Sequence, residues 1–239
     1  MAPSIGLSLP RIRLGGRDII GSARFDFAAG RTTALLGPSG VGKSTLLRLL
    51  AGLLPLPPGA RLDHSAHALT AWMGQQDLLL PWLDLLGNVT LGARLRGQRP
   101  DLGRARALIA EVGLQGREAA RPAELSGGMR QRAALARTLM EDRPVVLMDE
   151  PFSAVDAPTR HRLQTLAAGL LRGRTVVLVT HDPLEALRLA DRVLVLRPAA
   201  GGALPEEHPV PGTSTPRAAQ DPAVMAAQAT LLERLADMA

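Results

Sequence analysis

The chain has 239 residues, a formal net charge of +6, no cysteine and 46% hydrophobic residues. It is long enough for one compact domain with an additional segment, and no uninterrupted apolar run approaches the roughly 20 residues that cross a bilayer. The lack of cysteine excludes disulfides and thiolate metal sites and suits a cytoplasmic protein, and residues 1–16 show no central apolar block of the kind found in signal peptides.

Short apolar runs rich in β-branched residues predict the buried strands of a largely parallel sheet. They lie at residues 32–36, 145–148, 175–180 and 192–196, with helical stretches between them. Between residues 83 and 143 this strand pattern disappears. Amphipathic stretches at residues 85–95, 102–112 and 127–141 predict an inserted helical subdomain there. The pattern as a whole therefore predicts an α/β fold with a helical insertion.

The C-terminal part, residues 198–239, has a different composition. Residues 198–216 are rich in Pro, Gly and Ala, which predicts a linker. Asp221 can cap a following helix that has Pro222 at its first position. On that helix, apolar residues recur at helical spacing: Val224, Ala227, Leu231, Leu235 and Met238. We therefore expect the tail helix to dock on an apolar surface.

A glycine-rich turn follows the first predicted parallel strand. It fits the pattern G-x-x-x-x-G-K-[ST] and consists of Gly37, Pro38, Ser39, Gly40, Val41, Gly42, Lys43, Ser44 and Thr45. The backbone N–H groups of such a turn point into one concavity at a helix N-terminus, where a polyphosphate fits. Lys43 is the one lysine among 28 basic residues, which indicates that the site requires a slim ammonium group. Lys43 would reach the β- and γ-phosphates of a nucleotide, and the Ser44 hydroxyl would take one Mg²⁺ position.

The phosphate loop alone leaves kinases, GTPases and motor ATPases open. A GTPase normally reads guanine with an N-K-x-D segment, and a chain without a second lysine cannot build one. Two adjacent acids that end the strand at residues 145–148 add to the predicted site. Asp149 lies where a Mg²⁺-binding carboxylate is needed beside the loop, and Glu150 can polarise an attacking water.

Residues 125–132, with the sequence LSGGMRQR, predict a second anion site. Ser126 can cap a helix whose first residues, Gly127 and Gly128, expose backbone N–H groups. Lying between the phosphate loop and a VVLMDEP strand, this segment resembles the signature of ATP-binding cassette ATPases. The resemblance covers roughly residues 20–197. It implies a P-loop NTPase (RecA-like) core with an antiparallel β portion near the N-terminus.

The same resemblance implies the domain boundaries. The ATPase domain is expected at residues 1–197, with the helical subdomain at about residues 83–143 inserted in the nucleotide-binding core. Residues 198–239 are expected to form the linker and the C-terminal helix.

The resemblance also implies roles that spacing alone does not supply. Ser126, Gly127 and Gly128 are expected to contact the γ-phosphate of ATP held by a second copy of the chain, so that two copies close head to tail over two nucleotides. Asp156 belongs to a segment that resembles the D-loop linking the two sites. His181 resembles the switch histidine that contacts the γ-phosphate and helps to orient the water.

A glutamine that senses Mg²⁺ is expected between the first helix and the helical subdomain, where Gln75 and Gln76 compete. The family often has a proline six residues after this glutamine, and Pro81 favours Gln75. The resemblance therefore implies Mg²⁺ ligands at Ser44, Gln75 and Asp149. An aromatic residue usually precedes this glutamine, but Gly74 stands there in this chain.

A second departure from the family concerns the adenine. Cassette ATPases commonly stack the base on an aromatic residue upstream of the phosphate loop, and this chain has no tyrosine. Phe25 and Phe27 share one face of a predicted strand and are expected in the core. This leaves Ile12, Arg13 or Leu14 to cover the base, and we expect weak selectivity between ATP and GTP.

Among cassette ATPases, the chain resembles the stand-alone subunits of transporters whose membrane-spanning subunits are separate polypeptides. The 83 positions from Lys43 to Ser126 leave no room for the long coiled coil of chromosome-maintenance or repair ATPases. The densest basic cluster, at arginines 94, 96, 99, 104 and 106, contains no aromatic residue for stacking on bases. A non-transport ATPase acting on nucleic acid is the alternative, together with an exporter subunit.

Residues 77–82 and the MRQR segment resemble importers of the nitrate, sulfonate and taurine group. Within that group, residues 75–82, with the sequence QQDLLLPW, look most like cassettes for thiamine precursors such as hydroxymethylpyrimidine. The resemblance implies ATP and Mg²⁺, a homodimer, membrane permease subunits, an indirect periplasmic binding protein, no nucleic acid, and a place at the cytoplasmic face of the inner membrane. Trp82, Leu83 and Leu86 are candidates for a groove that receives a permease coupling helix, or are core residues of the helical subdomain.

Overall fold

The structure, a computed structural model, describes residues 2–63, 69–212 and 214–238. The chain divides into two compact units. The first unit comprises Met1–Thr70, Pro144–Asp149 and Leu171–Ala239, and the second comprises Ala71–Arg143 and Glu150–Leu170. The division differs from the expected domain boundaries in two ways. Residues 150–170 belong to the unit that contains residues 83–143, and residues 198–239 belong to the first unit.

The first unit contains a sheet with the strand order β11-β10-β5-β9-β8. Its strands are β5 (Thr32–Leu36), β8 (Val145–Asp149), β9 (Thr175–Val179), β10 (Arg192–Arg197) and β11 (Leu204–His208). The four strands from β10 to β8 are parallel, and β11 is antiparallel to β10. Every residue of β8 and β9 is buried, which explains why these strands appear in the sequence as continuous apolar runs. The parallel strands predicted from the sequence are confirmed, with ends that differ by at most one residue.

The first unit also contains antiparallel strands, most of them near the N-terminus, as the fold class predicted. β1 (Ile5–Leu9) pairs on one side with β4 (Ala23–Phe27) and on the other with β6 (Arg61–Asp63). β2 (Ile12–Leu14) and β3 (Arg17–Ile20) form a separate two-stranded sheet. Phe25 and Phe27 point inward from β4 and are each 1% exposed, which confirms that they are core residues. α1 (Lys43–Leu50) packs against β8 and β9.

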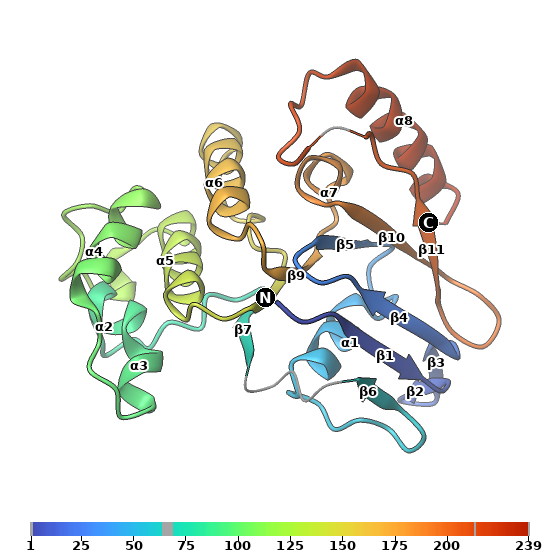
Figure 1. The fold of residues 1–239 in the computed structure, drawn as a ribbon, viewed down its shortest axis with the longest axis horizontal. Coiled ribbons are helices and arrows are strands. Elements are labelled where there is room, and N and C mark those ends of the chain that lie inside the picture. Colours follow the sequence, from blue (N-terminus) through green and yellow to red (C-terminus); the bar gives the residue numbers. More distant parts are fainter. Residues whose placement is uncertain (1, 64–68, 213, 239) are drawn as a thin grey trace. The chain divides into compact units, whose positions relative to one another are not determined.

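The C-terminal helix α8 (Pro222–Ala236) packs against α7 (Pro183–Leu189) in the first unit (Figure 1). Asp221 caps α8 as expected, because its Oδ1 accepts a hydrogen bond from Ala223 N at 2.9 Å. The five apolar tail residues join a cluster formed by α7, β5 and β10, and Val224 and Leu231 are completely buried. The prediction that the tail helix docks on an apolar surface is therefore confirmed.

The predicted linker at residues 198–216 is corrected by the structure, since Leu204–His208 forms β11. This strand lies at the edge of the sheet. An edge strand tolerates Pro205, because a proline has no N–H to donate and one side of an edge strand has no partner strand. Ion pairs join it to β10: Arg192 Nη2 lies 2.9 Å from Glu207 Oε2, and Arg197 pairs with Glu206. Pairing with β10, a tertiary interaction, therefore orders a segment whose composition indicates a loop.

The second unit consists mainly of helices. They follow β7 (Thr70–Met73), whose first residue ends the first unit, and are α2 (Leu85–Val89), α3 (Leu91–Leu95), α4 (Leu102–Glu111), the 3-10 helix η2 (Pro122–Glu124), α5 (Gly127–Met140) and α6 (Ala157–Leu170). The single helix expected at residues 85–95 is corrected to two short ones, because Thr90 ends α2 and begins α3 with a hydroxyl that donates to Leu86 O at 2.8 Å. α5 packs against both α2 and α4. Within the described residues, no helix is long and apolar enough to cross a bilayer.

Candidate functional site

Three predicted functional segments of the first unit emerge at one edge of its parallel sheet. The glycine-rich loop follows β5, Asp149 ends β8, and His181 comes shortly after β9. The register aligns Leu35 with Val179 and Val179 with Asp149. Since the carboxyl ends of parallel strands meet at one edge, the fold brings these segments together there. Ligands of open α/β sheets bind at such an edge.

The backbone of the loop at residues 37–45 requires glycine at two points. Gly37 has φ 143°, and a Cβ on it would lie 2.7 Å from Leu196 O. Gly42 has φ 108°, and a Cβ there would lie 2.9 Å from Ile19 Cγ2. Gly42 is also the N-cap of α1, which begins at Lys43. The chain thus turns from β5 into a helix N-terminus, whose backbone N–H groups and partial positive charge suit a phosphate.

The Lys43 side chain lies across the start of this loop. Its Nζ donates to Gly37 O at 2.7 Å and to Pro38 O at 2.9 Å, and the residue is 8% exposed. The ammonium group is therefore held within the loop by main-chain carbonyls. A phosphate placed in the loop would meet a cation that the loop itself has positioned.

Two oxygen-bearing side chains of the first unit have the chemistry of a Mg²⁺ site. Asp149 is 2% exposed at the end of β8, and Ser44 lies in the first turn of α1, which packs against β8. A carboxylate and a hydroxyl are hard oxygen ligands of the kind Mg²⁺ prefers, with the remaining positions taken by phosphate and water. The donor set of these two residues fits Mg²⁺.

His181 is exposed between two anchored neighbours. Asp182 N donates to Thr180 Oγ1 at 3.0 Å, and Asp182 Oδ1 accepts a hydrogen bond from Leu184 N at 2.9 Å as the N-cap of α7. Thr180 N donates to Leu35 O at 3.2 Å. The main chain on both sides of His181 is therefore fixed, while its imidazole remains accessible.

Gln75 and Glu150 lie together in the second unit. Gln75 Nε2 donates to Glu150 Oε2 at 3.4 Å. Glu150 has φ 50°, a left-handed conformation that a residue with a side chain rarely adopts. Backbone strain of this kind clusters at functional sites, where the surrounding structure holds it in place.

The signature residues begin α5. Ser126 Oγ accepts a hydrogen bond from Met129 N at 3.3 Å, which caps the helix. Gly127 is exposed. Gly128 lies close to residues 153–156, the segment that resembles the D-loop, because a Cβ on it would be 3.1 Å from Ala154 O. Asp156 accepts a hydrogen bond from Thr159 N at 3.1 Å, and hydrogen bonds from the Thr159 backbone and side chain hold the pKa of Asp156 below its usual value.

Two arginines of α5 hold the segment around Gln75, and the sequence reasoning missed both. Arg130 Nε donates to Asp77 Oδ2 at 3.0 Å. Arg137 donates to Asp77 O at 2.6 Å and to Leu78 O at 2.7 Å, and burial lowers the pKa of its guanidinium. The spacing of seven residues, which places both arginines on one helix face, was the available signal.

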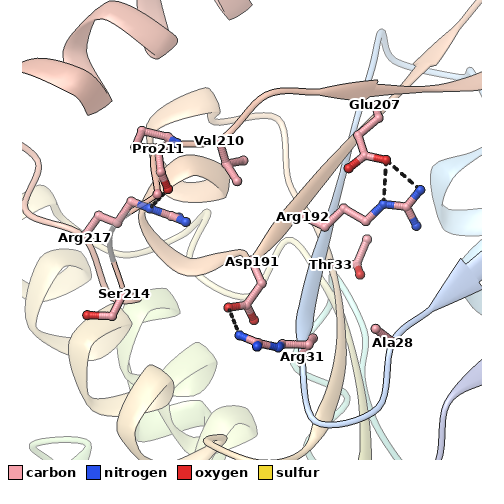
Figure 2. A pocket seen from close by; sticks show the side chains of 11 residues that line it. Ala28, Arg31, Thr33, Asp191, Arg192, Glu207, Val210, Pro211, Ser214 and Arg217 are labelled. Atoms are coloured by element: carbon pink, nitrogen blue, oxygen red, sulfur yellow. Dashed lines mark hydrogen bonds and ion pairs between the residues drawn. The ribbon is translucent and has the colours of Figure 1, made fainter.

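A cavity of about 520 Å³ lies at the opposite edge of the first unit's sheet, at the amino ends of β5 and β10. Figure 2 shows two ion pairs among its charged side chains, while Arg217 donates to the Pro211 carbonyl. Arg31 Nη1 lies 3.2 Å from Asp191 Oδ1, and Arg192 pairs with Glu207. This cavity is therefore separate from the phosphate loop, which follows the carboxyl end of β5.

The candidates for adenine contact occupy β2. Ile12 is 7% exposed, so it is a core residue. Arg13 is exposed, with Nε 3.2 Å from Asp18 Oδ1. The side chain of Leu14 lies outside what the structure describes.

Of the three groove candidates, Trp82 is 68% exposed, and Leu83 and Leu86 are half-buried. The core alternative is therefore wrong for Trp82.

A comparison with known protein families agrees with the order of the motifs in the sequence and with their meeting at one sheet edge. A family model described as "ABC transporter" matches residues 20–153 of the chain. The chain belongs to this family. Its fold is accordingly the α/β P-loop NTPase fold of the ABC cassettes, as expected from the sequence.

Relatives within the ABC transporter family resemble the chain along most of its length. A protein of Delftia acidovorans named "Aliphatic sulfonates import ATP-binding protein SsuB" is 46% identical over 222 residues, which are 92% of this chain and 89% of that protein. A Burkholderia cenocepacia protein, "Aliphatic sulfonates import ATP-binding protein SsuB 2", is 44% identical over 239 residues, covering 97% of this chain and 87% of its own.

A solved structure of an ABC cassette also superposes on the chain. It is the dimeric post-hydrolysis state of the ATP-binding cassette MJ0796 bound to ADP and Pi, with a TM-score of 0.74 and 28% identity. The match covers 87% of this chain and 100% of the MJ0796 chain.

Proposed function

We propose that the chain is the ATP-hydrolysing, energy-coupling subunit of an ABC importer that takes up an aliphatic sulfonate through separate membrane subunits. The observation that carries this proposal is the register that brings the loop at residues 37–45, Asp149 and the segment leading to His181 to one sheet edge. The cargo is inferred from the printed names of two relatives that align over most of the chain. These names favour a sulfonate over the thiamine precursor considered from the sequence.

In this proposal, residues of the first unit bind the nucleotide phosphates. Backbone N–H groups of the loop surround them, and Lys43 exchanges its carbonyl partners, Gly37 O and Pro38 O, for oxygens of the β- and γ-phosphates. The exposed imidazole of His181 contacts the γ-phosphate from the neighbouring strand. Glu150, a residue of the second unit, is the proposed general base that accepts the proton of the attacking water.

Ser44, Asp149 and Gln75 are the proposed Mg²⁺ ligands. Bound Mg²⁺ supplies positive charge that stabilises the phosphate oxygens during hydrolysis. Within the second unit, the Gln75 amide contacts the Glu150 carboxylate.

We further propose that the working unit contains two copies of the chain. Ser126, Gly127 and Gly128 of each copy would contact the γ-phosphate bound by the other, using the exposed N-terminus of α5. ATP then stabilises the closed dimer, and hydrolysis releases it. The dimeric state of the MJ0796 cassette, to which the chain is similar, supports this arrangement.

The proposed membrane partners are permease subunits that receive cargo from a periplasmic binding protein, with the chain at the cytoplasmic face. An exposed Trp82 beside half-buried Leu83 and Leu86 suits the docking of a short amphipathic coupling helix. Crosslinking from a cysteine at position 82 to the permease tests this contact, and a crosslink that forms only from a control cysteine at exposed Arg99 would contradict it.

Growth and uptake test the transport function as a whole. We expect a strain that lacks the gene to lose uptake of an alkanesulfonate and growth on it as sole sulfur source, but to grow normally on sulfate. The wild-type gene should restore uptake, and a gene encoding Glu150→Gln should not. If the strain that lacks the gene keeps sulfonate uptake but loses hydroxymethylpyrimidine uptake, the proposed sulfonate cargo is wrong. ATPase activity that is stimulated by DNA and not by permease would favour the nucleic-acid alternative.

A further inference from the structure

One buried side chain of α5 joins this helix to the turn that begins at Glu150. Gln131 is 5% exposed. Its Nε2 donates to Glu150 O at 3.0 Å and to Ser153 Oγ at 3.3 Å. Its Oε1 accepts a hydrogen bond from Ala154 N at 2.7 Å. A single amide therefore contacts three residues of the 150–154 turn, all within the second unit.

These contacts fall on the strained residue of that turn. Glu150 has φ 50°, and the direction in which its side chain leaves the backbone depends on this angle. Its carbonyl oxygen accepts hydrogen bonds from Gln131 and from Ser153 Oγ, the latter at 3.1 Å. Since both donors act on the carbonyl of the strained residue, they oppose relaxation of the backbone toward a common conformation.

Glutamine suits position 131 because the turn at residues 150–154 offers both hydrogen-bond acceptors and a hydrogen-bond donor. An uncharged glutamine amide donates through nitrogen and accepts through oxygen at the same time. A glutamate of the same shape would accept from Ala154 N but could not donate to Glu150 O. A methionine of similar volume would make none of the three hydrogen bonds.

We propose that Gln131 is a positioning residue for hydrolysis, which holds the Glu150 main chain so that its carboxylate faces the attacking water. This inference rests on the proposed role of Glu150 as general base. Gln131 lies one helical turn after Gly127 and Gly128, which are proposed to contact the nucleotide of the second copy. It therefore also links these two glycines to the proposed base, Glu150, of the same copy.

Steady-state kinetics of the full-length protein test this role. We expect Gln131→Glu and Gln131→Met each to lower kcat about tenfold to a hundredfold with little change in KM for ATP, because the base is misplaced while the phosphate loop is untouched. Ser153→Ala removes the other side-chain donor to the same carbonyl and should act in the same direction more weakly. Gln164→Met, at a glutamine of α6 that is 4% exposed, serves as the matched control for burial and should leave kcat unchanged.

The division of the effect between kcat and ATP binding separates positioning from a purely structural role. Both Gln131 variants should lower kcat while KM for ATP and retention of ATP stay near wild type, and Gln164→Met should change none of these quantities. A kcat within twofold of wild type in Gln131→Glu would overturn the proposal. Losses in kcat that merely follow losses in Tm across all variants would overturn it as well.

The outcome for Glu150→Gln keeps this inference distinct from the proposed function. If Glu150→Gln is inactive and the Gln131 variants are normal, positioning by Gln131 is wrong and the base assignment stands. If Glu150→Gln turns over ATP normally, the base assignment fails, and the positioning role fails with it.

Discussion

The side-chain amide of Gln75 donates to the carboxylate of Glu150 at 3.4 Å, although the two residues are 75 positions apart in the chain. Both belong to the second unit, in which Arg130 and Arg137 of α5 hold the segment that follows Gln75. The proposed base therefore contacts the residue proposed to sense Mg²⁺.

Lys43→Arg should lower ATP binding or turnover at least tenfold although the positive charge is kept. Lys43 Nζ fits between Gly37 O and Pro38 O in a loop where the residue is 8% exposed, and a planar guanidinium is too broad for that space. ATPase assays and binding of a fluorescent ATP analogue measure both effects. Arg48→Lys, the reverse change at an exposed position of α1, is the control. An active Lys43→Arg protein would contradict the assigned role.

Gly37→Ala should abolish nucleotide binding and lower the Tm. The added Cβ would lie 2.7 Å from Leu196 O, and φ at this position is 143°, so the loop has to change its path. Gly103→Ala in α4, where the nearest atom to the added Cβ is 3.4 Å away, should be neutral or slightly stabilising. Equal Tm and equal nucleotide affinity in the two variants would show that the loop tolerates a side chain at Gly37.

Arg217→Met should destabilise the protein by about 2–4 kcal/mol, because the buried guanidinium would no longer satisfy its carbonyl partners. Arg217 Nη1 donates to Leu187 O at 2.6 Å and to Ala190 O at 2.7 Å, and its Nε donates to Pro211 O at 3.0 Å. Urea denaturation gives the free energy of unfolding.

The control for this change is Arg31→Met, which removes an exposed ion pair with Asp191 and should cost less than about 1 kcal/mol. Similar losses in the Arg217 and Arg31 variants would mean that Arg217 does not hold the tail on α7.

Acid should loosen the tail through His208. Burial, and secondarily the nearby Arg234, lower the pKa of this imidazole, while a hydrogen bond to the Ala227 backbone raises it. The unfolded chain therefore binds a proton at a higher pH than the folded one, and stability is lost as pH falls below about 6.5. Between pH 7.5 and 5.5, the wild-type Tm should fall more than that of His208→Gln. Parallel Tm curves would contradict a titrating His208.

Some parts of the fold were predictable because they depend on local sequence. The buried strands β8 and β9 appear as continuous apolar runs. Ser126 caps α5 and Asp221 caps α8, each directly before the first residue of its helix. These signals are contained in a few adjacent residues. The glycine-rich loop is equally local, since its pattern and its strand-to-helix context lie within one stretch of chain.

Other parts depend on partners that are distant in the sequence. β11 contains Pro205 and two acids and becomes a strand because β10 offers it a sheet edge and two arginines. The division of the helix expected at residues 85–95 is different in kind, because the Thr90 hydroxyl donates to Leu86 O only four positions away and the apolar pattern of these residues does not reveal it. The contacts of Gln131 with the turn after Glu150 join segments 19–23 residues apart, which no local pattern encodes.

The central claim is that this chain binds ATP with its phosphate loop and hydrolyses it with Glu150 as base. Its most direct test measures ATP turnover and ATP retention by purified Glu150→Gln beside the wild type, in the presence of Mg²⁺. We expect the variant to retain ATP, to form a stable dimer with it, and to lose turnover by a factor of about 10²–10⁴. Steady-state hydrolysis at the wild-type rate by Glu150→Gln would contradict the account.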